Sequence, residues 1–208
     1  MPKQKAKTLL FDLGNVIIDL DINKAFESLQ QLCKRDANQS KIDNVIQKYE
    51  CGQVSTEIFI NTLLSQSYSD VQALDIIEAW NSMLLGIPDK RLRMLRELKQ
   101  IYNVYLLSNT NWLHLEWVHR YMKTAHGVDD FENEFFHKAY YSHVVGDRKP
   151  KPSLFQYVIK DAALYPEETL YMDDVQENIN TAINLRFQTY LVKPGEEIGD
   201  YLKKEDYY

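Results

Sequence analysis

The sequence predicts an α/β fold, with a parallel sheet and a helical insertion after the first strand. Short apolar runs suited to buried strands recur along the chain with amphipathic stretches between them, an alternation typical of βαβ crossovers. The segment from Ile22 to about Pro88 is the exception, because only helical patterns occur there. A chain of 208 residues is long enough for one core with a smaller insertion.

Four apolar runs are predicted to be the strands of the sheet. Each is short and bounded by turn-forming residues, which is the pattern of a buried strand. These runs are Thr8–Asp12, Val104–Ser108, Leu170–Asp173 and Thr189–Val192. Three amphipathic stretches around them are predicted to be helices: Lys90–Ile101, Pro152–Ala163, whose proline suits a first helical turn, and Gln176–Arg186.

The insertion is predicted to be a bundle of helices. Apolar residues recur at helical intervals in Lys24–Cys33, Thr56–Leu64 and Val71–Leu84. Since the bundle follows the first strand, we expect it over the carboxyl edge of the sheet, where it either excludes water from chemistry or only covers apolar side chains. The predicted domains are an α/β core of residues 1–20 and 89–208 and a helical domain of residues 21–88.

Composition narrows the class of protein. A net charge of −6 disfavours nucleic acid and anionic membranes as partners. No apolar stretch approaches the roughly 20 residues that span a bilayer, and the basic segment Met1–Lys7 leads only into a strand-length apolar run, so we expect no signal peptide. Cys33 and Cys51 form neither a metal-binding pattern nor a disulfide framework. We therefore expect a cytoplasmic monomer or homodimer that acts on a small molecule.

Polar and charged residues follow the predicted strands, at the edge where α/β sheets bind ligands. Asp12 ends the first strand, Ser108–Thr110 ends the second, and Asp173–Asp174 ends the third. A basic loop, Gly146–Pro152, precedes the third strand. Each segment alone has a simpler interpretation as a turn acid, a helix cap or a solvated surface patch. A carboxylate, a hydroxyl, a fixed cation and an acidic pair in this order together indicate a phosphoryl-transfer site that uses a divalent metal.

With these residues the chain resembles the haloacid dehalogenase-like hydrolases, whose four motifs occur in order across nearly its whole length. The matching segments are Phe11–Val16, Leu107–Asn111, Lys149–Pro150 and Met172–Asn178. The insertion resembles the helical cap domain of that family, which implies a Rossmann-like core. The Asp-Leu-Gly-Asn form of the first motif is most similar to bacterial sugar-phosphate phosphatases of the family, the α-D-glucose-1-phosphate type in particular.

The resemblance implies a Mg²⁺-dependent phosphatase that hydrolyses a small phosphorylated metabolite, a sugar phosphate, through an aspartyl-phosphate intermediate. Asp12 would be the nucleophile. Asp12, Asp174 and the backbone carbonyl of Gly14 would hold Mg²⁺. Asp173 would be either a further ligand or a residue that orients the others.

The resemblance also implies how the phosphoryl group is bound. Ser108, Asn109 and Lys149 would contact the group, and the Lys149 ammonium would neutralise its charge. Lys151 also precedes a proline and competes with Lys149 for this role.

One departure from the family pattern concerns proton transfer. Typical phosphatases of the family carry a second aspartate two residues after the nucleophile as general acid and base, and here that residue is Gly14. A positioned acid or base contributes about 10²–10⁴-fold to the rate. The substrate therefore has a better leaving group, such as an anomeric phosphate, or Asp19, Asp21 or a substrate hydroxyl moves the proton, or the enzyme is slow. We favour the first explanation and interpret Asp19 and Asp21 as helix-entry acids.

Two other functions follow from the same motifs. The loss of the acid at Gly14 suggests a catalytically inactive binding or regulatory protein, but such a protein has no need for Asp12, Lys149 and two further acids at one site. A haloacid dehalogenase is the second alternative. Dehalogenases of the family use no metal and lack the tandem acidic pair, so Asp173–Asp174 argues against it.

Substrate specificity is expected from the insertion. The family usually places a substrate-facing turn between cap helices, and Glu50–Gln53 matches it, with Gly52 allowing a tight turn. Trp112 and His114, which follow the second motif, are further candidates for the pocket, or else are a packing aromatic and a surface histidine.

Overall fold

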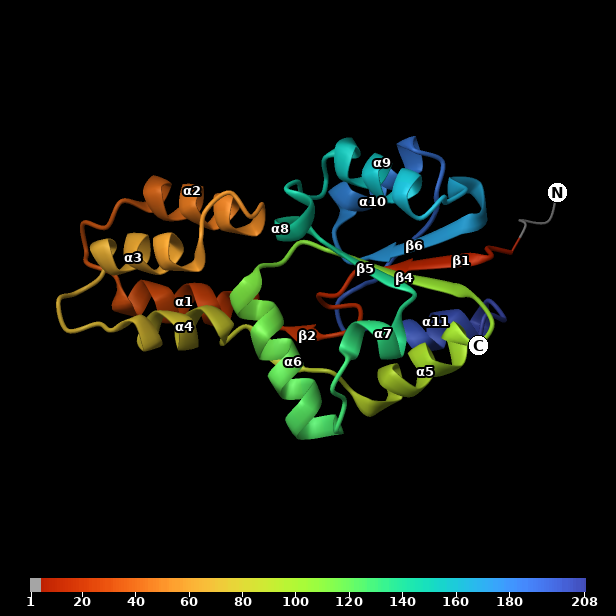
Figure 1. Ribbon diagram of the computed structural model, residues 1–208, viewed down its shortest axis with the longest axis horizontal. Coiled ribbons are helices and arrows are strands. Elements are labelled where there is room, and N and C mark those ends of the chain that lie inside the picture. The colour runs from red at the N-terminus through yellow and green to blue at the C-terminus, as the bar shows by residue number, and fades with distance from the viewer. Residues whose placement is uncertain (1–4) are drawn as a thin grey trace.

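The computed structural model describes residues 5–208 and consists of an α/β core with a helical insertion at one end of its sheet (Figure 1). The sheet has five parallel strands in the order β5-β4-β1-β6-β7. Their bounds are Thr8–Phe11 (β1), Asn103–Ser108 (β4), Lys138–Tyr141 (β5), Thr169–Asp173 (β6) and Gln188–Leu191 (β7). The predicted α/β fold with a parallel sheet and a helical insertion is confirmed.

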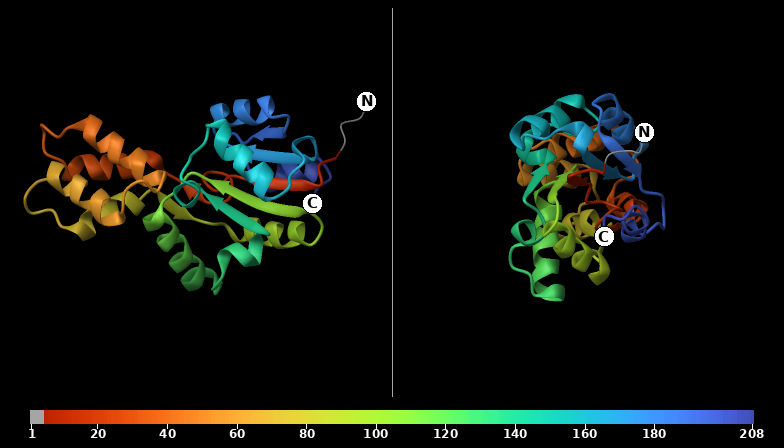
Figure 2. Two further views of the ribbon diagram at one scale, coloured as in Figure 1. Left: turned by 45° about the horizontal axis from the view of Figure 1, so that its top comes forward. Right: turned by 90° about the vertical axis from the view of Figure 1, so that its right-hand side faces the viewer.

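The central strand β1 sets the register of the sheet. Phe11 pairs with Leu106 of β4 on one side and with Met172 of β6 on the other. The next residue of each strand is therefore level with Asp12, so Asp12 and Asp173 leave the sheet side by side. The carboxyl edge of the sheet faces the helical insertion, as Figure 2 shows.

Helices cover both faces of the sheet. Leu9 and Phe11 belong to the larger apolar core, which extends under α5 and α11, while Leu10 faces the smaller core under α9 and α10. The two helix layers lie on opposite sides of the sheet in Figure 1. The core helices are α5 (Asp89–Lys99), α6 (Trp112–His126), α7 (Phe131–Phe135), α8 (Ser142–Val145), α9 (Pro152–Asp161), α10 (Gln176–Asn184) and α11 (Ile198–Lys204), with a 3₁₀ turn at Pro166–Glu168.

The insertion consists of α1 (Ile22–Leu32), α2 (Gln39–Glu50), α3 (Thr56–Gln66) and α4 (Ala73–Asn81). Two short antiparallel strands, β2 (Asp19–Leu20) and β3 (Leu84–Gly86), connect it to the core. The domain boundaries at residues 20/21 and 88/89 stay a prediction, and residues 1–4 of the predicted core segment lie outside the described residues. No helix in the described part of the chain is both long and apolar enough to cross a membrane.

The structure differs from the predicted secondary structure at several elements. Strand β3 lies within the segment where only helices were expected, and the predicted helix Val71–Leu84 is wrong at its end because α4 stops at Asn81. Strands β2 and β5 and helices α2, α6, α7, α8 and α11 were not among the predicted elements. Strand β3 has only three residues, and only the last two residues of β5 are buried, so no apolar run of strand length marks either strand.

Candidate active site

Lys149 lies at the centre of the site. Its Nζ donates hydrogen bonds to Asp12 Oδ1 at 2.7 Å, to Asp173 Oδ2 at 2.7 Å and to the Leu107 carbonyl at 3.0 Å. The lysine is 1% exposed, and a buried ammonium is tolerated only where it is paired. Lys149 therefore links the two carboxylates that end β1 and β6, across the sheet edge.

The side chain of Asn109 holds the main chain of Lys149 in place. Asn109 Nδ2 donates to the Lys149 carbonyl at 3.0 Å, and Asn109 Oδ1 accepts from the Lys149 N–H at 2.9 Å. Asn109 also lies in the wall of a cavity next to Ser108, which is buried. Lys151, the competing lysine, is exposed and pairs with Asp147 at 3.0 Å. The structure thus brings Lys149, and not Lys151, to the acids.

Asp173 is fully buried and accepts several hydrogen bonds. Besides Lys149, its donors are the Val175 N–H at 2.7 Å, Asn178 Nδ2 at 3.0 Å and the Tyr171 hydroxyl. Burial alone would raise the pKa of Asp173, but the attraction of Lys149 and these hydrogen bonds outweigh it and lower the pKa. The carboxylate is therefore held in its ionised form as the partner of Lys149.

Asp12 and Asp174 complete an acidic cluster. Ligand atoms of Asp12, Asp173 and Asp174 all lie within 4.8 Å of one another. Burial raises the pKa of both Asp12 and Asp174, and the attraction of Lys149 offsets part of the rise at Asp12. Asp174 also accepts a hydrogen bond from Asn15 Nδ2 at 2.9 Å. The negative charges of Asp12 and Asp174 are therefore unfavourable in this buried cluster. A hard divalent cation such as Mg²⁺ would neutralise them and binds carboxylate oxygens.

The end of the Leu20 side chain lies next to Gly14, the position two residues after Asp12. A Cβ on Gly14 would lie 2.7 Å from Leu20 Cδ1, so this side chain would have to move aside for any other residue. Asp19 and Asp21, the other candidate proton carriers, form contacts elsewhere. Asp21 caps α1 by accepting from the Lys24 N–H at 3.1 Å, as expected of a helix-entry acid. Asp19 is not a cap but forms an ion pair with Arg91 at 2.7 Å.

A cavity of about 180 Å³ separates the insertion from the sheet edge. Its walls combine apolar side chains from both parts of the chain with a few polar groups near the site. From the insertion these include Phe26, Ile46, Glu50 and Trp80, and from the core Gly14, Ser108, Asn109, Thr110 and His114. The volume suits a small substrate.

The turn after α2 closes one side of this cavity. Glu50 Oε2 lies 2.8 Å from Arg148 Nη1, so an ion pair joins the insertion to the loop that carries Lys149. Gly52 has a φ of +65°, and a Cβ there would lie 2.0 Å from the His143 carbonyl oxygen. The turn therefore packs directly against α8, and only glycine allows this distance.

The two aromatic candidates differ in position. His114 is buried in the cavity wall, where its ring stacks on Trp80 with 4.9 Å between centroids. Trp112 is 53% exposed and packs its edge against His143. His114 is therefore not the surface histidine that its sequence context suggested.

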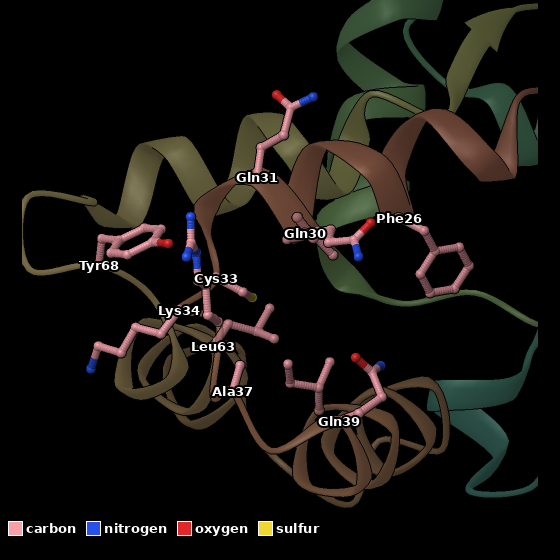
Figure 3. Close-up of a pocket in the computed structure, with 12 residues that line it drawn as sticks. Phe26, Gln30, Gln31, Cys33, Lys34, Ala37, Gln39, Leu63 and Tyr68 are labelled. Carbon is pink, nitrogen blue, oxygen red and sulfur yellow. The ribbon is translucent and has the colours of Figure 1, made fainter.

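A second cavity, of about 720 Å³, lies inside the insertion between α1, α2 and α3 (Figure 3). Phe26 lines both cavities, and in Figure 3 its ring lies at the end of the second cavity that is nearest to the core. The walls of this second cavity contain none of the predicted site residues.

Several contacts of the site were not predicted from the sequence. Each of four residues contacts an acidic side chain: Asn15 contacts Asp174, Tyr171 and Asn178 contact Asp173, and Arg148 contacts Glu50. The local sequence pattern does not show which acid each one contacts. Only their closeness in sequence to the motif residues could have indicated that they belong to the site. Asn15, Arg148, Tyr171 and Asn178 lie within five residues of Asp12, Lys149 or Asp173 along the chain.

Comparison with known proteins agrees with this geometry. A family model described as haloacid dehalogenase-like hydrolase matches residues 6–185. The D-ribitol-5-phosphate phosphatase of Bacteroides thetaiotaomicron is 30% identical over 196 residues, which cover 92% of this chain and 94% of that protein.

Solved structures show the same fold. A family enzyme from Bacteroides thetaiotaomicron, in complex with magnesium and inorganic phosphate, superimposes with a TM-score of 0.83 at 34% identity, covering 94% of this chain and 98% of its own. A predicted hydrolase from Porphyromonas gingivalis gives a TM-score of 0.84 at 26% identity, covering 97% and 98%. The four motifs converge on one sheet edge, and the family model spans most of the sequence, so the chain belongs to the haloacid dehalogenase-like hydrolases.

Proposed function

We propose that this hydrolase is a Mg²⁺-dependent phosphatase that acts on a small phosphorylated polyol, with ribitol 5-phosphate as the first candidate. The observation that carries the proposal is the pairing of Lys149 Nζ with Asp12 and Asp173 beside a third acid. The phosphatase relative and the related enzyme solved with magnesium and phosphate support it.

The metal is assigned to Asp12, Asp174 and the backbone carbonyl of Gly14. Bound Mg²⁺ neutralises charge on the phosphoryl oxygens. Asp173 is assigned to Lys149, because its oxygens already accept hydrogen bonds from Lys149, Val175 and Asn178. Of the two roles expected for Asp173, we therefore propose that it orients Lys149 and does not bind the metal directly.

The phosphoryl group is bound by Lys149, Ser108 and Asn109. An oxygen of Asp12 attacks phosphorus, and the bond from phosphorus to the substrate oxygen breaks with its electron pair on that oxygen, which takes a proton. Water then attacks the aspartyl phosphate, releasing phosphate and restoring Asp12. Lys149 holds Asp12 in place and stabilises the charge that develops on the transferring group.

The substrate class rests on two observations. The relative of similar length acts on a polyol phosphate, and the cavity of about 180 Å³ suits a molecule of that size. An anomeric sugar phosphate is the second candidate, because Gly14 supplies no acid and an anomeric oxygen leaves more easily. We also propose a cytoplasmic location, which the free thiols of Cys33 and Cys51 support, while a monomer or homodimer stays a prediction.

The test is phosphate release from ribitol 5-phosphate, glucose 1-phosphate and an aryl phosphate, with Mg²⁺ or with EDTA. We expect release that needs both Mg²⁺ and Asp12, with Asp12→Asn as the inactive control. A higher kcat/KM for glucose 1-phosphate than for ribitol 5-phosphate would reverse the substrate assignment. No release above the Asp12→Asn background from any substrate would overturn the phosphatase.

A further inference from the structure

We propose that Glu50, at the end of α2 in the insertion, is the general acid and base that serves the leaving group in place of Gly14. This inference rests on the proposed phosphatase function. It assigns a catalytic role to a residue outside the four family motifs, and it makes the insertion part of the active site.

Position 14 carries no acid, because it is a glycine. The end of the Leu20 side chain lies 2.7 Å from the place that a Cβ on Gly14 would take. Asp19 and Asp21 follow in the chain, but neither lines the cavity, and both are bound elsewhere, to Arg91 and to the N-terminus of α1. A protein group that supplies the proton is therefore sought among the other walls of the cavity.

Few side chains in the cavity walls can donate a proton. Of the described residues that line the cavity, Glu50 and His114 are the two whose side chains exchange protons near neutral pH. Both ring nitrogens of His114 are already used: Nδ1 lies 3.1 Å from Asn111 Nδ2, and Nε2 lies 3.3 Å from the Trp80 carbonyl. His114 is thus a structural residue, which leaves Glu50.

Contacts with the core hold Glu50 in place. Its Oε2 pairs with Arg148 Nη1 at 2.8 Å, and Arg148 directly precedes Lys149, which binds Asp12. The close approach of Gly52 to the His143 carbonyl fixes the same turn against the core. A carboxyl group from the insertion is therefore anchored to the loop that carries the lysine of the site.

The surroundings of Glu50 suit a group that is protonated for part of the cycle. Burial raises the pKa of Glu50 above its ordinary value, while Arg148 lowers it. Other titratable groups near it are His114, across the cavity from α6, and Cys51, the next residue in the chain, on which Asp147 and Lys151 also act. A carboxyl group whose pKa is raised by burial is the type of group that enzymes use as a general acid.

The proposed proton transfers are balanced over the two steps. As Asp12 attacks phosphorus and the leaving oxygen takes the bonding electrons, the carboxyl proton of Glu50 moves to that oxygen, leaving an alcohol and the Glu50 carboxylate. As water attacks the aspartyl phosphate, one proton of the water returns to Glu50, and the bond to Asp12 breaks with its electrons on Asp12.

The test compares leaving groups in Glu50→Gln, with Glu57→Gln as a matched control, since Glu57 is an exposed glutamate of the same insertion. An alkyl alkoxide needs a proton to leave, and an aryl oxide does not. We expect kcat/KM, which reports only the transfer to Asp12 and the departure of the leaving group, to fall by about 10²–10⁴-fold for ribitol 5-phosphate in Glu50→Gln. For 4-nitrophenyl phosphate kcat/KM should change by less than about threefold. Glu57→Gln should match the wild type on both substrates.

Two further variants separate proton transfer from a structural contact. Arg148→Gln removes the ion pair but keeps the acid, so the alkaline limb of kcat for ribitol 5-phosphate should move to higher pH. Glu50→Asp keeps a carboxyl group and should retain part of the activity on the alkyl phosphate. Far-ultraviolet circular dichroism and thermal melting confirm that each variant is folded.

An equal loss of kcat/KM on both substrates in Glu50→Gln, or a change in the KM of ribitol 5-phosphate with kcat unchanged, would overturn the role of Glu50 as acid and base. So would a pH profile of Arg148→Gln identical to that of the wild type. Wild-type protein that releases no phosphate from either substrate would instead overturn the proposed function. The two failures are therefore distinguishable.

Discussion

The side chain of Leu20 packs against Gly14 across the turn that follows β1. A Cβ on Gly14 would lie 2.7 Å from Leu20 Cδ1, closer than such atoms approach in folded proteins. The backbone N–H of Leu20 donates to Asn15 Oδ1 at 3.1 Å, which keeps β2 near the site. The absence of a second aspartate is therefore accompanied by a leucine that occupies its space.

Substitutions at these two positions should be coupled. We expect Gly14→Ala to lower the free energy of unfolding by about 1 kcal/mol or less, because the end of the Leu20 side chain must move aside. In a Leu20→Ala background the same change should cost less, because the space is free. Urea unfolding of the two single variants and the double variant measures the coupling. Additive effects would mean that the two side chains do not compete for this space.

Replacement of Gly52 by alanine should be more harmful than replacement of Gly127, which has a similar backbone conformation. Gly52 and Gly127 have φ of +65° and +66°, but a Cβ on Gly127 has no neighbour within 4 Å, while one on Gly52 meets the His143 carbonyl. Gly127→Ala should cost about 1 kcal/mol of stability from its backbone conformation alone. Gly52→Ala should also displace the turn and reduce kcat/KM. Equal kinetics in both variants would argue against close packing of this turn during turnover.

Lys149 should be needed for stability as well as for activity. Lys149→Met leaves the carboxylates of Asp12 and Asp173 buried without their cation, and breaking such a pair costs about 3–5 kcal/mol. Lys151→Met is the matched control, because Lys151 is exposed and water screens its pairing with Asp147. Chemical denaturation of both variants in EDTA checks the difference. Similar unfolding free energies would show that Lys149 does not neutralise the acids.

Removal of Mg²⁺ should lower the melting temperature of the wild type, but not that of a variant without the Asp174 carboxylate. Mg²⁺ that binds only the folded protein stabilises it by about 2.7 kcal/mol at a hundredfold excess over Kd. We expect Asp174→Asn to abolish the shift between EDTA and Mg²⁺, measured by differential scanning calorimetry. Asp129→Asn, which removes an exposed acid paired with Lys123, is the control and should keep the shift. An unchanged shift in Asp174→Asn would place the metal elsewhere.

His114 should make the protein less stable as the pH falls. Burial lowers the pKa of His114 from 6.5 to about 4 in the folded protein. Between these values the unfolded chain binds a proton that the folded protein does not, so stability is lost as pH falls from 6.5 towards 4. The contribution of this one group amounts to about 3 kcal/mol over that window.

The measurement is the free energy of unfolding at pH values from 7 to 5. His114→Gln should show a shallower fall than the wild type, with His119→Gln as the control for loss of an exposed histidine. The slope should not vanish, because burial also lowers the pKa of His143 to about 4. A slope equal to that of the wild type would rule out His114 as its source.

Much of the fold was predictable because its signals are local. Strands β1, β4 and β6 contain short apolar runs of buried residues that end at polar residues, so neighbouring positions in the sequence indicate their burial. Strand β7 was also predicted, although its four residues are only half-buried. Strand β5 begins with an exposed lysine and only its last two residues are buried, so no such run marks it. Strand β3 forms only because the chain returns to pair with β2.

The sequence by itself determined the fold class, the family and the order of the acids, hydroxyl and lysine at the strand ends, because the apolar pattern along a chain reports which strands are buried and where each one stops. Only the tertiary structure decided which lysine reaches Asp12, why Asp173 belongs to Lys149, and that Glu50 meets Arg148. The physical reason is that these contacts join residues far apart in sequence. Their charges and pKa values depend on burial and on neighbours that the folded chain alone brings together.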